Sequence, residues 1–116
     1  MWAGPRTDVE RELLARLERV ARAGIADPAF TVERLGSRVG MSRRRLQRSL
    51  GRLTGLGPNA WLQELRLETA RGLLLRGHVV SEAAGAAGLS PGSLTRLCTA
   101  WYGIRPSDAR RGESSP

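Results

Sequence analysis

The sequence predicts an all-α fold of about seven helices, with two helix-turn-helix modules joined by a long central helix and an amphipathic helix at the N-terminus. Three observations support this prediction. Apolar residues recur at helical spacing along most of the chain, one nine-residue pattern occurs twice, and a proline opens a long leucine-rich stretch between the two copies. The 116 residues suffice for one domain, whose core must consist mainly of Leu, Val and Ala because only 4% of the residues are aromatic.

The first expected helix lies within residues 1–26. Thr7 and Glu10 have the spacing of a capping box, and Gly24 provides a stop. Five apolar residues share one face of this helix: Val9, Leu13, Leu14, Leu17 and Val20. Such a helix either transmits a signal or forms a dimer, or it packs on its own domain. The charges of residues 1–30 cancel, which argues against binding of a polyanion by this segment.

The repeated pattern predicts two copies of one supersecondary unit. Residues 40–48 align with residues 88–96 at an offset of 48, and both read Gly, apolar, Ser, three variable residues, Leu, any residue, Arg. The alignment continues without a gap to Pro58 and Pro106. We therefore expect helix-turn-helix modules at about residues 31–55 and 80–102.

In the first copy, Thr31 is the expected N-cap of a short helix, Gly40 its left-handed end and Ser42 the N-cap of the next helix. Met41 fills the turn between them. The residues expected to face the core are Val32, Leu35 and Val39, followed by Leu46, Leu50 and Leu53.

In the second copy, Gly88 is the expected stop, Ser90 the N-cap and Pro91 the first helical residue. The residues expected to face the core are Val80, Ala83, Ala84 and Ala87, followed by Leu94, Leu97 and Trp101. Small residues replace larger ones here, so we expect a looser fold in this copy.

Positive charge is concentrated in the repeated part. The net charge is +8 and all 19 basic residues are arginine, an absence of lysine that a GC-rich genome also explains. Residues 31–116 hold fourteen arginines against six acidic residues, which accounts for the whole excess. A basic stripe on a folded domain predicts a polyanionic partner. The helix expected at residues 58–76 would be about 28 Å long, close to the roughly 34 Å between successive major-groove faces of DNA.

The sequence holds few residues that could form a disulfide, a metal site or a catalytic site. One cysteine, Cys98, and one histidine, His78, allow no intrachain disulfide and too few ligands for a zinc site. No nucleophile with its base, no phosphate-binding glycine loop and no membrane segment is recognisable, so we expect a cytoplasmic chain that is not an enzyme and needs no cofactor. Cys98 is expected in the core, His78 in a loop, and residues 111–116 in a disordered tail.

Three stretches resemble the AraC-type DNA-binding domain across residues 27–110. They are TVERLGSRVGMSRRRLQRSL, LTGLGPNAWLQELRLETARGLLL, and VSEAAGAAGLSPGSL with GIRPSDAR. The likeness is strongest to output domains of hybrid two-component sensors, and ERELLARLERVARAGIADPAF resembles the helix that connects a receiver to such a domain. The resemblance implies a C-terminal fragment whose partners are duplex DNA, RNA polymerase, an upstream receiver or sensor domain, and a second copy in a homodimer of the full-length protein. No basic amphipathic helix with aromatic anchors is recognisable in the sequence, so we expect no membrane partner.

The resemblance also assigns roles in the first module. Arg44, Gln47 and Arg48 would contact base edges, while the residues near phosphates would be Ser42, Arg43, Arg45 and Arg52. The helical pattern agrees, because Arg44 and Arg48 lie opposite the inward leucines. Two alternatives remain at this point: a solvated basic face that touches only phosphate, and an ion pair of Arg48 with Glu33 or Glu64.

The second module departs from the family pattern at its turn and in its helix, where Gly92 offers no side chain and Cys98 replaces a Phe. Ser93, Thr95 and Arg96 are its remaining candidates for base contact. The sequence thus predicts a DNA-binding transcription regulator in which the first module dominates. The principal alternative is a degenerate module that binds an acidic protein. RNA binding is disfavoured because aromatic stacking residues are scarce.

Overall fold

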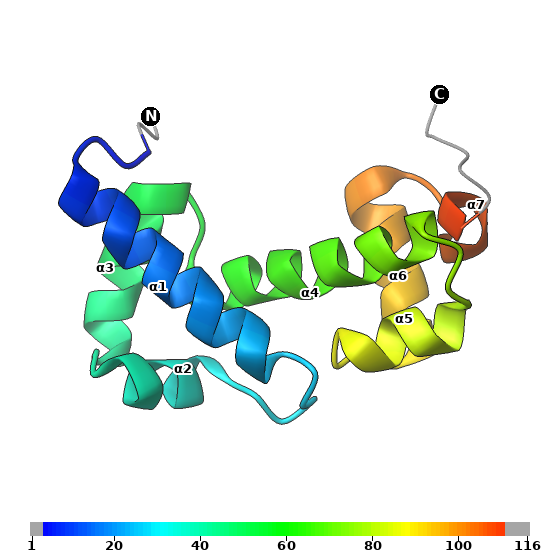
Figure 1. Cartoon of the computed structure of the whole chain (residues 1–116), viewed down its shortest axis with the longest axis horizontal. Coiled ribbons are helices and arrows are strands. Elements are labelled where there is room, and N and C mark those ends of the chain that lie inside the picture. The colour runs from blue at the N-terminus through cyan, green and yellow to red at the C-terminus, as the bar shows by residue number, and fades with distance from the viewer. Residues whose placement is uncertain (1–3, 111–116) are drawn as a thin grey trace. The chain divides into compact units, whose positions relative to one another are not determined.

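The computed structural model describes residues 4–110, and in this range every regular secondary-structure element is a helix (Figure 1). The seven helices are α1 (Asp8–Gly24), α2 (Val32–Val39), α3 (Arg43–Thr54), α4 (Pro58–Leu75), α5 (Val80–Ala86), α6 (Pro91–Tyr102) and α7 (Pro106–Arg110). The all-α prediction is confirmed, and the expected N-terminal helix is one of the seven. The tail expected at residues 111–116 lies outside the described residues.

The described residues form two compact units. The first unit comprises residues 4–24 and 29–64, and the second comprises residues 25–28 and 65–110. Helix α4 therefore contributes its first turns to one unit and the remainder to the other. None of the helices in residues 4–110 combines the length and the apolar character that crossing a membrane requires.

Helix α1 opens with the predicted capping box. The Thr7 Oγ1 atom accepts a hydrogen bond from the backbone N–H of Glu10 (3.1 Å), and Glu10 Oε1 accepts one from the backbone N–H of Thr7 (3.3 Å). The helix packs against α2 and α3, as the domain-packing alternative requires. The prediction for Val9 is wrong, because its side chain is 79% exposed. Burial along α1 is concentrated in its later turns, at Leu17, Ala21 and Gly24.

The pair α2–α3 forms as its sequence predicts. Thr31 Oγ1 accepts a hydrogen bond from the backbone N–H of Arg34 (3.3 Å), and Ser42 Oγ accepts one from that of Arg45 (3.2 Å). Gly40 ends α2 with φ +70°, the left-handed conformation that glycine adopts without strain. The buried residues include all those expected to face the core: Val32, Leu35, Val39, Leu46, Leu50 and Leu53, with Met41 buried in the turn.

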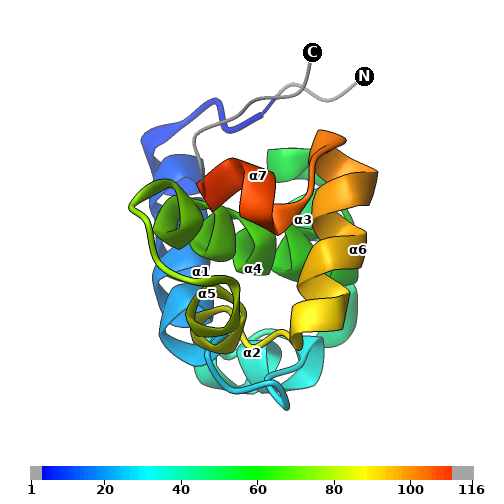
Figure 2. The same cartoon turned by 90° about the vertical axis from the view of Figure 1, so that its right-hand side faces the viewer.

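In the second unit, α5, α6 and α7 pack against one another (Figure 2). Ser90 Oγ accepts a hydrogen bond from the backbone N–H of Ser93 (3.1 Å), and Pro91 is the first residue of α6. The core contains Leu67, Ala70, Leu74, Ala83, Ala84, Ala87, Leu94, Leu97, Cys98 and Ala109. Val80, which was expected to face it, is only partly buried against this core.

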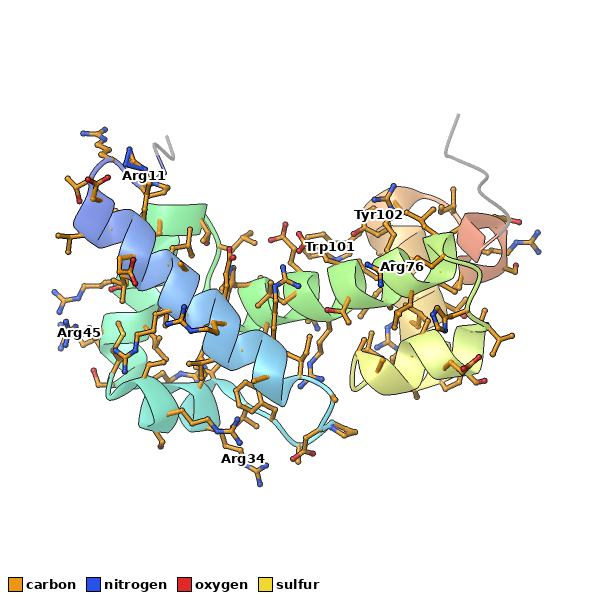
Figure 3. The ribbon with its side chains drawn as sticks, viewed as in Figure 1. Arg11, Arg34, Arg45, Arg76, Trp101 and Tyr102 are labelled. Atoms are coloured by element: carbon orange, nitrogen blue, oxygen red, sulfur yellow. The ribbon has the colours of Figure 1, made fainter. Side chains whose placement is uncertain are left out.

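The prediction that Trp101 faces the core is wrong, because its side chain is 42% exposed. Leu94 and Cys98 are buried, and Tyr102 continues this i, i+4 row by packing on the same core. The last turn of α6 therefore presents Tyr102 to the core instead. Figure 3 labels both aromatic side chains.

One buried arginine organises the second unit. Arg66 on α4 is 7% exposed. Its Nη1 atom donates to the carbonyl oxygens of Ile25 (2.6 Å), Ala87 (2.9 Å) and Gly88 (3.4 Å), and Nη2 donates to that of Asp27 (3.4 Å). Burial lowers the pKa of Arg66, and the charge of Asp27 opposes this effect. Arg66 thus ties the turn after α5 to the segment after α1.

Candidate nucleic-acid interface

Helix α3 is strongly basic. It contains Arg43, Arg44, Arg45, Arg48 and Arg52 and no acidic residue. The cap formed by Ser42 and the left-handed stop at Gly55 (φ +79°) fix where this helix begins and ends. A local sequence of twelve residues therefore presents five guanidinium groups on one rigid element.

One face of α3, called the partner-free face below, has no polar partner among residues 4–110. Leu46 and Leu50 are fully buried, and at 100° per residue Arg44 and Arg48 lie on the opposite side. The side chains of Arg44, Arg45, Gln47 and Arg48 are all exposed. Within residues 4–110, these four side chains make no hydrogen bond or ion pair. Figure 3 shows Arg45 projecting outward from α3.

The proposed ion pair of Arg48 is therefore not formed within the described part of the chain. Glu33, one of its two suggested partners, instead pairs with Arg43. Both side chains of the Arg43–Glu33 pair are more than half exposed, at 53% and 63%. A backbone hydrogen bond at Glu33 and the charge of Arg43 lower the pKa of the Glu33 carboxyl. Water screens such an exposed pair, so Arg43 can exchange its partner at little cost.

Arg52, at the other end of α3, pairs with Glu10 of α1. The Arg52 side chain is 61% exposed, whereas that of Glu10 is only 15% exposed. The sequence indicated Glu10 only as part of a capping box. Its second contact depends on the packing of α1 against α3, which the spacing of residues along the chain does not reveal.

The second module offers fewer free groups. The Thr95 hydroxyl donates to the Pro91 carbonyl oxygen (3.0 Å), and the hydroxyls of Ser90 and Ser93 are 3.0 Å apart. Arg96 is exposed and is the one arginine of α6. Of the three candidates for base contact in this module, only Arg96 has a side chain that makes no hydrogen bond among the described residues.

Residues 4–110 contain no group of three or more His, Cys, Asp or Glu side chains that could hold a metal ion. Cys98 is buried, as predicted for a core residue. Burial raises the pKa of its thiol and Arg71 opposes the rise, so the reactive thiolate is disfavoured.

Three residues that shape these surfaces were not predicted in their observed roles. Glu10 and Glu33 hold arginines of α3, and Arg66 holds the turn before α6. A weak indication existed for Glu33, because it was considered as a partner of a neighbouring arginine. For Arg66, a charged residue among leucines within an apolar stretch indicates a buried, hydrogen-bonded role.

Comparison with known proteins identifies relatives of this arrangement. Residues 35–112 match the model of a helix-turn-helix domain family. The DNA-binding domain of AdpA, a global transcriptional factor solved in complex with a target DNA, is 34% identical, with a TM-score of 0.75 over 85% of this chain and 90% of that chain. A transcriptional regulator with an AraC-type DNA-binding domain from Chromobacterium violaceum is 25% identical, with a TM-score of 0.79 over 95% of this chain and 99% of that chain. The C-terminal domain of AraT, a response regulator from Geobacillus stearothermophilus, shares the fold at 20% identity, with a TM-score of 0.75 over 95% of this chain and 89% of that chain.

Proposed function

Because the chain belongs to the AraC-type helix-turn-helix family, we propose that it binds duplex DNA with sequence preference and regulates transcription. The observation that carries this proposal is the partner-free face of α3. A capped helix with exposed guanidinium groups has the dimensions and the charge to enter a major groove.

The proposed roles of the residues follow from their places on α3. Arg44, Gln47 and Arg48 contact base edges, where arginine pairs with guanine and glutamine with adenine. Residues at the flanks and ends of the helix contact phosphates instead: Ser42, Arg43, Arg45 and Arg52. In the second module, Arg96 is the best-placed candidate for DNA contact. Ser93 and Thr95 contribute less because their hydroxyls are already hydrogen-bonded, to the Ser90 hydroxyl and to the Pro91 carbonyl oxygen respectively.

The experiment that tests these roles compares Arg44→Ala with Arg43→Ala on a set of duplexes of different sequence. We expect Arg44→Ala to relax base preference at a cost of about 1–3 kcal/mol, and Arg43→Ala to weaken binding to all sequences alike. Equal losses on every sequence for both variants would refute the assignment of Arg44 to base contact.

The second candidate function is a protein-interaction module with an acidic partner. The exposed Trp101 and the single arginine of α6 favour it for the second module. Salt weakens both kinds of binding, but only DNA recognition produces a preference among duplex sequences. Binding titrations across salt and sequence therefore separate the two functions.

We further propose that the chain acts as the output domain of a larger, signal-responsive protein in the cytoplasm. The resemblance of residues 10–30 to a receiver-connecting helix supports this role. Its expected partners are an upstream receiver or sensor domain, RNA polymerase, and a second copy in the full-length homodimer. In vitro transcription with purified RNA polymerase, from a promoter bearing the selected site, tests the regulatory part. An unchanged transcript level at saturating protein would contradict regulation of that polymerase.

A further inference from the structure

The carboxylate of Glu10 has two functions at once. Its Oε1 atom accepts hydrogen bonds from the backbone N–H groups of Arg6 (3.0 Å) and Thr7 (3.3 Å), which caps the start of α1. Its Oε2 atom pairs with the guanidinium of Arg52 on α3. One side chain thus connects the first turn of the N-terminal helix to the basic helix.

Arg52 lies beside the partner-free face of α3. At 100° per residue it is about 40° from Arg48 around the helix axis, and the inward leucines lie on another side. A guanidinium at this position could extend to a DNA phosphate if it were released. Its ion pair with Glu10 neutralises the charge that such a contact requires.

The surroundings of Glu10 make this pair harder to exchange than the Arg43–Glu33 pair. Glu33 is 63% exposed, so water can solvate its carboxylate when Arg43 leaves. Glu10 is 15% exposed, and loss of Arg52 would leave a largely buried carboxylate without a compensating positive charge. Displacement of Glu10 from Arg52 by a phosphate should therefore cost more free energy than displacement of Glu33 from Arg43.

We propose that Glu10 is a positioning residue that withholds Arg52 from the DNA backbone and so limits the number of phosphate contacts made by α3. The inference rests on the proposed function and adds a condition to the phosphate contact proposed there for Arg52. Arg52 contacts phosphate only when the charge of Glu10 is removed or its carboxylate moves away. Because the same carboxylate caps α1, the phosphate contact is coupled to the integrity of the first turn of α1.

The salt dependence of DNA binding measures this effect directly. Each phosphate neutralised by the protein adds about 0.9 to the magnitude of the slope of log K against log salt concentration. The probe is a fluorescently labelled duplex of random sequence, because phosphate contacts do not depend on sequence. Glu10→Gln is the informative variant, since glutamine retains the capping interaction and removes the charge.

We expect Glu10→Gln to steepen the slope by about 0.9, whereas Glu12→Gln leaves it unchanged. Glu12 is an exposed acid on the same helix, and its side chain makes no hydrogen bond or ion pair within the described range, so it controls for the general effect of removing a negative charge. The double variant Glu10→Gln/Arg52→Ala should have the slope of Arg52→Ala alone. Circular dichroism of each variant verifies that its helices remain intact.

Two results would overturn the inference while leaving the proposed function in place. The first is that the unaltered chain binds DNA and Glu10→Gln leaves the slope of its salt dependence unchanged. The second is that Glu10→Gln steepens the slope equally with and without Arg52, or that Glu12→Gln steepens it as much. Either form of the second result would show a general charge effect. Failure of the unaltered chain to bind any duplex would instead overturn the proposed function, and the inference with it.

Discussion

The two helix-turn-helix modules share their turn and cap chemistry but differ in charge and in the size of their buried side chains. In both, a serine caps the second helix and a glycine at φ of about +70° precedes it, Gly40 in one and Gly88 in the other. Helix α3 carries five arginines and α6 carries one. The first helices also differ, because α2 buries Val32, Leu35 and Val39, whereas α5 buries only Ala83 and Ala84.

The comparison shows that the backbone geometry of such a module depends on a few local features, while its binding surface can vary independently. Ser42 and Ser90 accept the same kind of backbone hydrogen bond although the helices they cap have different charges. The second module also has an additional support in Arg66, which donates to the carbonyl oxygens of Ala87 and Gly88. Four predictions test this contrast.

The largest difference is expected in the cores. Leu46→Ala removes a fully buried side chain from the first module and should lower the free energy of unfolding by about 2–5 kcal/mol. Cys98→Ala deletes only one sulfur atom in the second module, so we expect a loss of about 1 kcal/mol. Urea denaturation of both variants measures the difference. Equal losses would show that the smaller residues of the second module are packed as effectively as the leucines of the first.

Removal of the Arg66 guanidinium should selectively destabilise the second unit. Arg66→Met keeps much of the side-chain volume but leaves the buried carbonyl oxygens of Ile25 and Ala87 without this donor. We expect a loss of about 2–3 kcal/mol in the free energy of unfolding. Arg76→Met, at an exposed position just after α4, should change it by less than about 0.5 kcal/mol. A similar small change for both variants would exclude a stabilising role for the Arg66 contacts.

Arg48 and Arg96 occupy equivalent positions in the repeat and therefore form a matched pair for DNA binding. Arg48→Ala should cost about 1–3 kcal/mol on a preferred duplex and relax the preference at one base position. Arg96→Ala should cost less than about 1 kcal/mol and affect all sequences equally. Titrations of matched and mismatched duplexes distinguish these outcomes. A larger and sequence-dependent loss for Arg96→Ala would contradict the proposal that the first module contributes more to DNA recognition than the second.

The smallest effects should come from the two caps, and they should be alike. Ser42→Ala and Ser90→Ala each remove one side-chain acceptor from a helix N-terminus, which costs about 1 kcal/mol of stability. Thermal unfolding followed by circular dichroism compares them. A clearly larger loss at one site would mean that the two turns are not equivalent in spite of their shared sequence pattern.

Local features of the sequence were sufficient to predict much of the fold. The caps at Thr31, Ser42 and Ser90 and the left-handed stop at Gly40 all depend on residues within one or two turns, and each is confirmed. Trp101 and Val9 were predicted incorrectly because helical periodicity gives the side of a helix but not how far the packed surface extends along it. Both residues lie in a terminal turn.

The ion pairs around α3 could not be predicted for a related reason. Glu10 and Arg52 are far apart in the sequence, and their contact arises only because α1 packs against α3. The outward direction of Arg44 and Arg48, by contrast, follows from the buried leucines of the same helix and could be predicted from the sequence. Their roles toward bases remain predictions.

Site selection from a random duplex pool at near-physiological salt tests the central claim most directly. If the first module provides the sequence preference, the pool should yield one strongly enriched block of base pairs, from which Arg44→Ala removes part of the preference. Two equally enriched blocks about 10 base pairs apart would contradict the dominance of the first module. Salt-sensitive binding without any enriched sequence would contradict sequence-specific recognition itself and would favour the protein-interaction function.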